Sequence, residues 1–478
     1  MYSPAAEEGV RLFLKYGVVG DPWLTAIHRY PTLEPDAAAL VSDAVHEIAQ
    51  APLDRRLLGS WPVTDAQVQD AVREVILSSA AFDAFMERGE PALSIQSLQE
   101  AIRRVRLLVR EGGLARLLLG YGYTALVENL MAVRHYGRMR EDDFISGRLH
   151  RPWIARSLEH ELAAGLAMHH YELVVADDGR YVRLTRKGHE TWRDAQALWQ
   201  VTGYAKTRLR LSMMAEFMHL GDLDELSEII LPGFMDLRRA FIAESGIPRH
   251  ADLLEIGSGS GLLTFDAGLY ETLAPRTLTL LDPSPVLTAI AKRKAAKLRA
   301  RRTRFVRGVA EALPFPPDAF DHVLAFAVMQ YTDRARALEE LFRVLRPGGI
   351  LMVSAPLHVP ALEAPIMKRW FKPLNRPSHG PFVFLAPEDI PTHGRAAGFE
   401  ILDVSEHPTP VDYSRPELTV RIMLQFQIFQ ESLSRLPYQA RLDLTDDLIG
   451  RGRYLLSRGY EARFEGPVQW VKLRKPTA

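Results

Sequence analysis

A glycine cluster follows an apolar run and has two acids at informative positions. In DLLEIGSGSGLLTF, Gly257, Gly259 and Gly261 follow a strand-like stretch, and Glu255 stands two residues before the first glycine. A carboxylate at that place repels a pyrophosphate and attracts an ammonium group. Asp282 ends the next apolar run, TLTLLD, where a carboxylate can accept hydrogen bonds from a ribose diol. The pattern predicts a ligand that carries an amine and a ribose.

Two phosphate-binding motifs do not fit this cluster. The dinucleotide fingerprint G-x-G-x-x-G requires a glycine where Leu262 stands, and the P-loop requires a lysine after its last glycine. The implied ligand therefore carries no phosphate. Two alternatives remain open at this point: a tight turn of any doubly wound protein, and a degenerate domain that keeps the fold but binds nothing.

Strand and helix patterns alternate around the glycine cluster. The strand-like runs are DLLEI, TLTLLD, TRFVRG, FDHVLAFA, GGILMVS and FEILDV, which end near residue 404. Such alternation predicts an α/β fold with a doubly wound, mostly parallel sheet and helices on both faces. A last apolar run, GPVQWVKL, is expected to complete a seven-stranded sheet from an edge.

From Asp252 to Ser354 the chain resembles the class I S-adenosylmethionine-dependent methyltransferases, especially the quinone C-methyltransferases. LLEIGSGSG is similar to the first family motif and LLDPSPVLTAIAKRKA to the second. RGVAEALPFPPDAFDHVLA is similar to the third and fourth, and ALEELFRVLRPGGILMVSAP to the segment that closes the core. The resemblance implies S-adenosylmethionine as cofactor and in-line methyl transfer to a small-molecule acceptor, with proximity and orientation as the main source of catalysis.

The resemblance also implies roles for single residues. Glu255 and the glycines hold the methionine end, Asp282 holds the ribose, and Pro283 lies against the adenine. The implied cofactor-binding residues are Glu255, Gly257, Ser258, Gly259, Gly261, Asp282, Pro283, Ala310 and Glu311. One position departs from the family pattern, because Val309 stands where a carboxylate or amide commonly meets the adenine amine. Adenine recognition then depends on Glu311 or on backbone groups, with weaker affinity as a consequence.

Candidates for catalysis are few. Winged-helix O-methyltransferases of the plant type carry a histidine after the fourth strand, whereas this chain reads AVMQYTD there and Gln330 cannot act as a base. His358, in SAPLHVP, is the remaining candidate for a general base, and the alternative is a loop histidine that caps backbone groups. Tyr331 is a candidate for orienting the substrate, and packing at a strand end is its alternative.

Two insertions, near residues 356–386 and 410–460, interrupt the alternating pattern and are rich in apolar residues. Such insertions predict a lid over an apolar or aromatic substrate, and the alternative is that they only cover the sheet. The residues expected to line the substrate pocket are Gln330, Tyr331, Trp370 and Phe382. No metal site is expected.

The N-terminal half is predicted to be mainly helical. Residues 1–140 form a helical region, 141–204 a helix–hairpin–helix unit with its turn at Asp178-Gly179, and 205–245 a helical connector to the cofactor domain at 246–478. The middle unit resembles the winged-helix dimerisation domain of plant-type and polyketide O-methyltransferases. That resemblance implies a homodimer.

The competing interpretation is a winged-helix DNA-binding regulator whose C-terminal domain is a cofactor-binding or degenerate sensor. Its recognition helix would carry Glu159 and Glu161 with no cation after Arg156, and its wing would carry Asp177 and Asp178. Each neutralised phosphate needs a cation, so this unit is poorly equipped for DNA. A catalytically silent scaffold is a third alternative.

The composition limits the partners and the compartment. The chain has 59 Lys and Arg and 59 Asp and Glu, so it has no overall field for nucleic acid or membranes, although a local patch stays compatible with this balance. The basic run AKRKAAKLRARRTR is expected to be the solvated face of a helix, and nucleic acid is a poor substrate candidate. The absence of cysteine, of a signal-peptide pattern and of an uninterrupted apolar span predicts a cytoplasmic protein without a membrane span.

Overall fold

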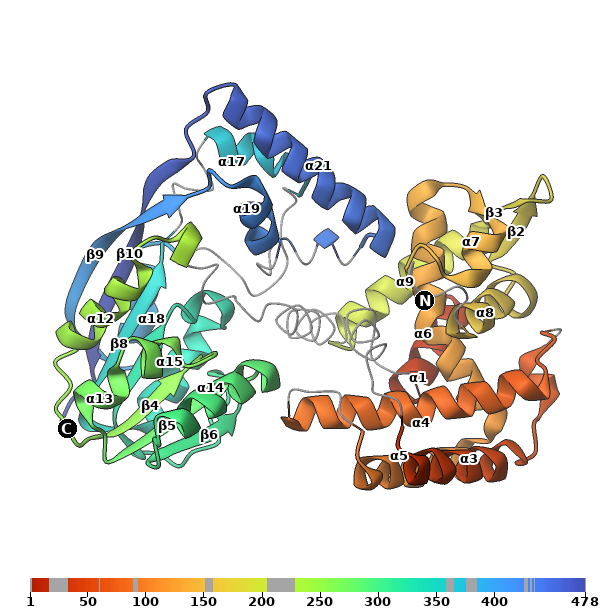
Figure 1. Ribbon diagram of the computed structural model, residues 1–478, viewed down its shortest axis with the longest axis horizontal. Coiled ribbons are helices and arrows are strands. Elements are labelled where there is room, and N and C mark those ends of the chain that lie inside the picture. The colour runs from red at the N-terminus through yellow and green to blue at the C-terminus, as the bar shows by residue number, and fades with distance from the viewer. Residues whose placement is uncertain are drawn as a thin grey trace. The chain divides into compact units, whose positions relative to one another are not determined.

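Two compact units make up the chain in the computed structural model (Figure 1). Unit 1 comprises residues 1–216 and 430–445, and unit 2 comprises residues 217–429 and 446–478. The structure describes residues 2–16, 33–59, 61–88, 93–150, 158–203, 228–357, 365–374, 385–424, 429, 432–433 and 435–477. The domain boundaries expected from the sequence stay a prediction, and much of the expected connector lies outside the described residues.

Unit 1 is mainly helical, as the sequence predicts. Its core surrounds α6, whose leucines and valines are buried on all sides. A capping box starts α5, where the Ser94 hydroxyl accepts the Ser97 N–H and the Ser97 hydroxyl accepts the Ser94 N–H. The helices are α1 (Pro4–Tyr16), α3 (Pro35–Ala49), η1 (Arg55–Leu58), α4 (Asp65–Arg88), α5 (Ile95–Gly112), α6 (Leu114–Tyr136), α7 (Glu141–Ser146), α8 (Leu158–Gly165), η2 (Leu166–His170) and α9 (Arg186–Val201).

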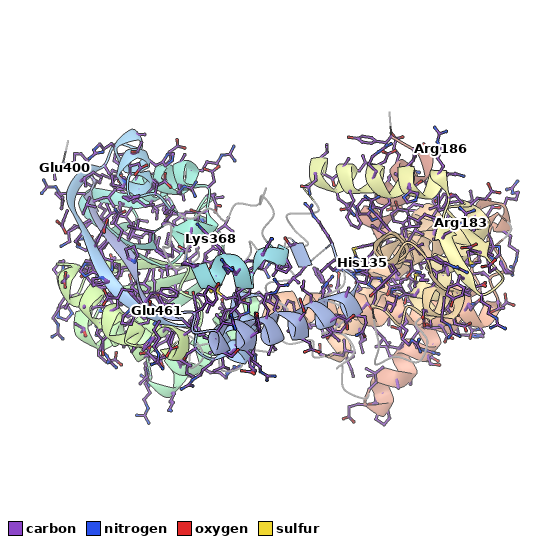
Figure 2. The ribbon with its side chains drawn as sticks, turned by 90° about the horizontal axis from the view of Figure 1, so that it is seen from above. His135, Arg183, Arg186, Lys368, Glu400 and Glu461 are labelled. Atoms are coloured by element: carbon purple, nitrogen blue, oxygen red, sulfur yellow. The ribbon has the colours of Figure 1, made fainter. Side chains whose placement is uncertain are left out.

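A small antiparallel sheet completes unit 1. It has the order β1-β3-β2, with β1 (Met139–Arg140), β2 (Val174–Asp177) and β3 (Tyr181–Leu184). The turn between β2 and β3 places Asp178 at φ +53° and Gly179 at φ +61°, which confirms the hairpin predicted there. Arg183 on β3 and Arg186 at the start of α9 follow this turn (Figure 2), and Arg186 pairs with Glu190. The assignment of this unit as a winged helix stays a prediction.

Unit 2 contains the seven-stranded sheet that the sequence predicts. Its order is β6-β5-β4-β7-β8-β10-β9; the pairs from β6 to β8 are parallel, and β10 is antiparallel to both of its neighbours. In chain order the strands are β4 (Asp252–Ile256), β5 (Thr277–Asp282), β6 (Thr303–Arg307), β7 (Phe320–Phe326), β8 (Leu345–Pro356), β9 (Glu400–Asp412) and β10 (Arg463–Arg474).

The expected edge position of the last strand is wrong. The final strand β10 lies between β8 and β9, so that β9 is the edge. Burial explains this order, because Trp470 and Val471 pack on opposite faces of β10 and are 1% and 0% exposed. On β9, by contrast, Leu402 and Val404 remain 38% and 44% exposed. The more apolar strand therefore takes the interior position.

Helices cover both faces of the sheet (Figure 1). One face packs against α12 (Phe234–Glu244), α13 (Leu269–Leu273) and α14 (Pro285–Lys297), and the other packs against α15 (Arg334–Val344) and α18 (Asp389–Ala396). Two separate apolar cores result, as in other doubly wound folds. The short turns η3 (Leu262–Asp266) and η4 (Met329–Tyr331) follow β4 and β7.

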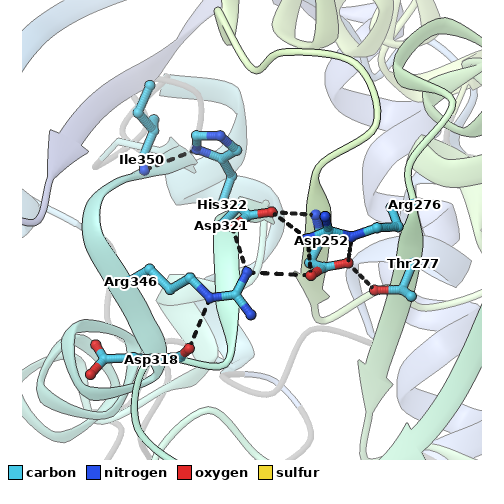
Figure 3. A network of polar contacts seen from close by, with 8 residues as sticks. All are labelled: Asp252, Arg276, Thr277, Asp318, Asp321, His322, Arg346 and Ile350. Atoms are coloured by element: carbon cyan, nitrogen blue, oxygen red, sulfur yellow. Dashed lines mark hydrogen bonds and ion pairs between the residues drawn. The ribbon is translucent and has the colours of Figure 1, made fainter.

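The amino ends of the central strands carry a network of ion pairs (Figure 3). Arg276 donates to both carboxylate oxygens of Asp252 and approaches Asp321 at 3.3 Å. Arg346 donates to Asp321 at 2.5 Å and to Asp252 at 3.3 Å. The backbone N–H of Asp252 adds a bond to Asp321 at 2.8 Å. Charged side chains thus connect the first residues of neighbouring strands.

The described parts of the two insertions pack against each other in a small core; we call them the cap, and their role as a lid stays a prediction. Its helices are α17 (Pro365–Trp370), η5 (Lys372–Leu374), α19 (Pro416–Met423) and the part of α21 (Tyr438–Ser457) that belongs to unit 2. The rings of Trp370, Phe371 and Phe429 stack in sequence at centroid distances of 5.5 Å and 5.3 Å. Within the described part of the chain, no helix is long and apolar enough to cross a membrane.

Candidate functional site

The glycine cluster forms a tight loop at the carboxyl end of β4. The N–H groups of Gly257 and Ser258 both donate to the carbonyl of Leu281, at 2.8 Å and 3.2 Å. Gly257 has φ +63°, and a Cβ at this position would lie 2.3 Å from Cγ2 of Val328. Position 257 therefore requires glycine for two reasons: its positive φ and the lack of space for a Cβ.

Asp282 joins this loop to the start of α14. One carboxylate oxygen accepts the N–H of Gly259 at 2.9 Å, and the other accepts the N–H of Ser284 at 2.8 Å. The side chain is 7% exposed, and its burial raises the pKa to about 6, although both backbone donors lower it. Each carboxylate oxygen has a second lone pair that remains available for a ligand donor. The Ser284 hydroxyl caps α14 by accepting the N–H of Leu287.

Glu255 is buried beneath the same loop, with 2% of its surface exposed. The Thr264 hydroxyl donates to its carboxylate, which lowers the pKa, but burial dominates and raises the pKa to about 8. The nearby charge of Asp282 raises this pKa further, and Arg238 lowers it. Without a cationic ligand, Glu255 is therefore mostly protonated at neutral pH.

Arg238 on α12 is a neighbour of this site that the sequence interpretation did not single out. It is 8% exposed, and its guanidinium lies 4.3 Å from the ring centre of Phe234 and 5.3 Å from that of Phe326. The signal was present in the sequence, because Arg238 lies between Phe234 and Phe241 on the buried stripe of an amphipathic helix. Because arginine is rarely buried, an arginine on such a stripe is a candidate for a functional residue.

The expected adenine rim is built from the segment after β6. Ala310 is buried, and Pro283 is partly exposed at the end of β5. Val309 pairs with Ala312 in an isolated antiparallel bridge, so this segment is a closed turn. Glu311 accepts the N–H of Asp333 at 3.0 Å through one carboxylate oxygen, which fixes its side chain near the start of α15. Its role towards adenine stays a prediction.

Gln330 and Tyr331 lie in η4, directly after β7. Gln330 is 5% exposed and donates from its side-chain amide to the carbonyl of Ala327 at 2.8 Å, while Ala327 has a left-handed φ of +53°. Burial raises the pKa of Tyr331 to about 12, so its hydroxyl stays protonated at neutral pH. Tyr331 can donate a hydrogen bond but is not a general base under those conditions.

Trp370 lies inside the core of the cap. It is fully buried, and its indole N–H donates to the carbonyl of Leu448 at 2.7 Å. A Cβ at Gly452 would lie 2.1 Å from its ring, so α21 packs directly on it. These contacts show that Trp370 packs against α21, and its role in a substrate pocket stays a prediction. His358 and Phe382, the other residues expected in the pocket, lie outside the described residues.

The arrangement brings Glu255, Ser258, Asp282 and the glycine loop together at one end of the sheet. Buried carboxylates dominate it, and such a site favours a ligand with ammonium and hydroxyl groups over a phosphate. Among the described side chains, no group of three His, Asp or Glu residues is placed to hold a metal ion. The chemistry of the site therefore matches the amine-and-ribose ligand that the sequence predicts.

A family model described as a methyltransferase domain matches residues 254–353. A rice (Oryza sativa subsp. japonica) 2-methyl-6-phytyl-1,4-hydroquinone methyltransferase is 35% identical over 111 residues, which are 23% of this chain and 30% of that protein. The demethylmenaquinone methyltransferase of Thermus thermophilus is 41% identical over 102 residues, 21% of this chain and 45% of that protein. The chain thus spans less than half the length of these two relatives.

Among solved structures, a phosphoethanolamine N-methyltransferase of Haemonchus contortus in complex with S-adenosyl-L-methionine is 16% identical. The match covers 50% of this chain and 52% of that chain at a TM-score of 0.34. These matches give no support to the DNA-binding regulator. Residues 254–353 are a methyltransferase domain, and the seven-stranded sheet that contains them has the class I methyltransferase fold.

Proposed function

We propose that this chain is an S-adenosylmethionine-dependent methyltransferase that acts on a small apolar or aromatic metabolite. The observation that carries the proposal is the pair of buried carboxylates beside one glycine loop in a methyltransferase domain: Glu255 precedes the loop, and Asp282 at the end of β5 accepts the N–H of Gly259. S-adenosylmethionine supplies a methyl group on a sulfonium centre, with an ammonium group on one side and a ribose on the other. The two carboxylates match these two polar groups.

The remaining groups of the loop complete the proposed cofactor site. Glu255 would hold the ammonium group, with Gly257, Ser258, Gly259 and Gly261 letting the backbone approach the methionine end. Asp282 would accept hydrogen bonds from the ribose while its backbone donors keep it in place. The proposed adenine contacts are Pro283, Ala310 and Glu311.

The proposed acceptor is a quinone-type molecule. Support comes from the names of the matched relatives, a phytyl hydroquinone methyltransferase and a demethylmenaquinone methyltransferase. An aromatic hydroquinone ring suits a pocket of apolar groups with few polar ones. Gln330 and Tyr331 are proposed to orient its oxygens, because both are polar and lie at the carboxyl end of β7. His358 and Phe382 are further proposed contacts of the acceptor.

Calorimetric titration of S-adenosylmethionine and S-adenosylhomocysteine tests the cofactor site. The wild type is expected to bind both, and Asp282→Ala is expected to lose most of the affinity because it removes the ribose acceptor and frees two loop N–H groups. Asp282→Asn keeps one side-chain acceptor and should fall between the two. Asp236→Ala removes an exposed carboxylate of α12 and is the matched control. Absence of binding by the wild type would overturn the proposal.

Three further parts of the proposal concern the whole chain. Residues 141–204 would be a winged helix, the protein would be a homodimer, and it would act in the cytoplasm on a small molecule rather than on nucleic acid. The helix–hairpin–helix order of that segment supports the first part. Light scattering of the purified chain should give twice the mass of 53.8 kDa, and a monomeric mass would contradict the dimer.

A further inference from the structure

The edge of the sheet formed by β6 carries a concentrated positive charge. From Pro283 to Ala310 the sequence contains no Asp or Glu. The same stretch contains nine cations: Lys292, Arg293, Lys294, Lys297, Arg299, Arg301, Arg302, Arg304 and Arg307. They lie on the C-terminal part of α14, on the turn that follows it and on the edge strand β6 (Figure 1). We call these nine residues the basic edge.

Most of this charge faces solvent. All nine side chains except Lys294 belong to exposed residues, and Lys294 is paired with Asp266 at 2.5 Å. Arg302 donates to the carbonyl of Pro275 at 3.5 Å, which is a neutral acceptor. Within the described part of the chain, Lys297, Arg299, Arg301 and Arg304 have no carboxylate partner. The chain as a whole is neutral, so this charge is local rather than a property of the composition.

An exposed leucine stands at the centre of the basic edge. Leu298 is the C-cap residue of α14 and is 44% exposed. The next residue, Arg299, has a left-handed φ of +53°, which turns the chain sharply back towards β6. Leu298 is therefore presented at the tip of a turn between Lys297 and Arg299. Exposed apolar side chains flanked by Lys and Arg are typical of surfaces that contact membranes.

We propose that the basic edge is a docking surface for the anionic face of a phospholipid bilayer. The unpaired Lys and Arg side chains would attract anionic headgroups, and Leu298 would enter the boundary between headgroups and acyl chains. The interaction is peripheral and reversible. It requires no membrane-crossing segment and does not depend on the proposed methyl transfer.

A bilayer fits these observations better than a nucleic acid. Nucleic-acid surfaces that bind single strands add aromatic platforms to their cations, but the aromatic ring of this region, Phe305, is partly covered and has Lys292 5.9 Å from its centre. An exposed leucine also makes no favourable contact with a charged phosphate backbone. A variant of Leu298 therefore distinguishes a bilayer from a nucleic acid, because it removes the apolar side chain and leaves the charge of the surface unchanged.

Sedimentation of the full chain with vesicles tests the proposal. Vesicles of phosphatidylcholine alone are compared with vesicles that contain phosphatidylserine. The triple variant Lys297→Gln, Arg301→Gln, Arg304→Gln removes three cations of the basic edge. The matched control Arg249→Gln, Arg395→Gln, Arg458→Gln removes three exposed cations elsewhere in unit 2. Thermal unfolding of each variant verifies that it is folded.

The wild type is expected to bind the anionic vesicles selectively and to dissociate as the ionic strength rises. The triple variant should bind roughly a hundredfold more weakly, since each cation near an anionic surface contributes roughly fivefold in binding, while the control triple should bind as the wild type does. Leu298→Ser should also weaken binding. Equal binding to both vesicle types, or equal loss in both triple variants, would overturn the proposal. So would tight binding to a DNA duplex that Leu298→Ser leaves unchanged.

Discussion

The carboxyl groups at the two ends of β4 have pKa values that are shifted in opposite directions. At the amino end, the pKa of Asp252 is held well below its ordinary value, chiefly by hydrogen bonds from Arg276 (Figure 3). Three residues later, burial raises the pKa of Glu255 to about 8. The difference lies in the neighbours, because Asp252 faces two arginines while Glu255 is enclosed with another acid, Asp282, and with Arg238.

These opposite shifts contribute to stability with opposite signs. The lowered pKa of Asp252 stabilises the fold above about pH 4, and this contribution is lost as the pH falls. The raised pKa of Glu255 means that the folded protein holds a proton that the unfolded chain releases, so stability falls as the pH rises towards 8. At pH 7 this costs about 3 kcal/mol. The ion pairs at the amino end therefore contribute stability, and the cost at the carboxyl end is consistent with the binding role that we propose for it.

The largest expected effect concerns the glycine loop of the carboxyl end. Gly257→Ala should destabilise the protein by about 2–4 kcal/mol, because it adds a clash with Val328 to the strain of a positive φ. Gly259→Ala has a similar φ of +54° but meets its nearest atom, on Leu287, only at 3.9 Å, so about 1 kcal/mol is expected. Denaturant unfolding of both variants measures the difference. Equal losses would show that the contact with Val328 contributes nothing.

A smaller effect is expected at the amino end. Arg346→Met should destabilise the protein by about 1–2 kcal/mol, since it leaves Asp252 and Asp321 with Arg276 alone and the arginine is partly screened by water. The same variant should bind S-adenosylmethionine with unchanged affinity, because the network is at the opposite end of the strands. Denaturant unfolding and calorimetry on the same preparation measure both quantities. A loss of affinity without a loss of stability would reverse the assignment of the two ends.

Much of this comparison could be predicted from the sequence. The runs DLLEI and TLTLLD are parallel strands, as expected, because strands that alternate with helices form parallel sheets. The burial of Glu255 and Asp282 beside one loop agrees with their places at strand ends, and their roles towards a cofactor stay predictions. The position of β10 was predicted wrongly, because an edge was expected although the apolar residues of its two faces suit an interior strand.

The residues that act through distant contacts were the hardest to anticipate. Thr264 donates to Glu255 only because the turn after Gly261 brings it back beneath the loop. Trp370 donates to the carbonyl of Leu448, 78 positions later in the chain, and its expected place in a substrate pocket stays a prediction. Neither contact leaves a periodic pattern in the sequence.

The dependence of cofactor affinity on pH tests the central claim most directly. If Glu255 must release its proton to hold the ammonium group, the affinity of the wild type for S-adenosylmethionine should rise up to about tenfold per pH unit below pH 8 and level off above it. Glu255→Gln should bind more weakly and lose that part of the dependence. Calorimetric titrations of both proteins across this range measure the two slopes. Identical slopes and affinities would contradict a binding role for this carboxylate.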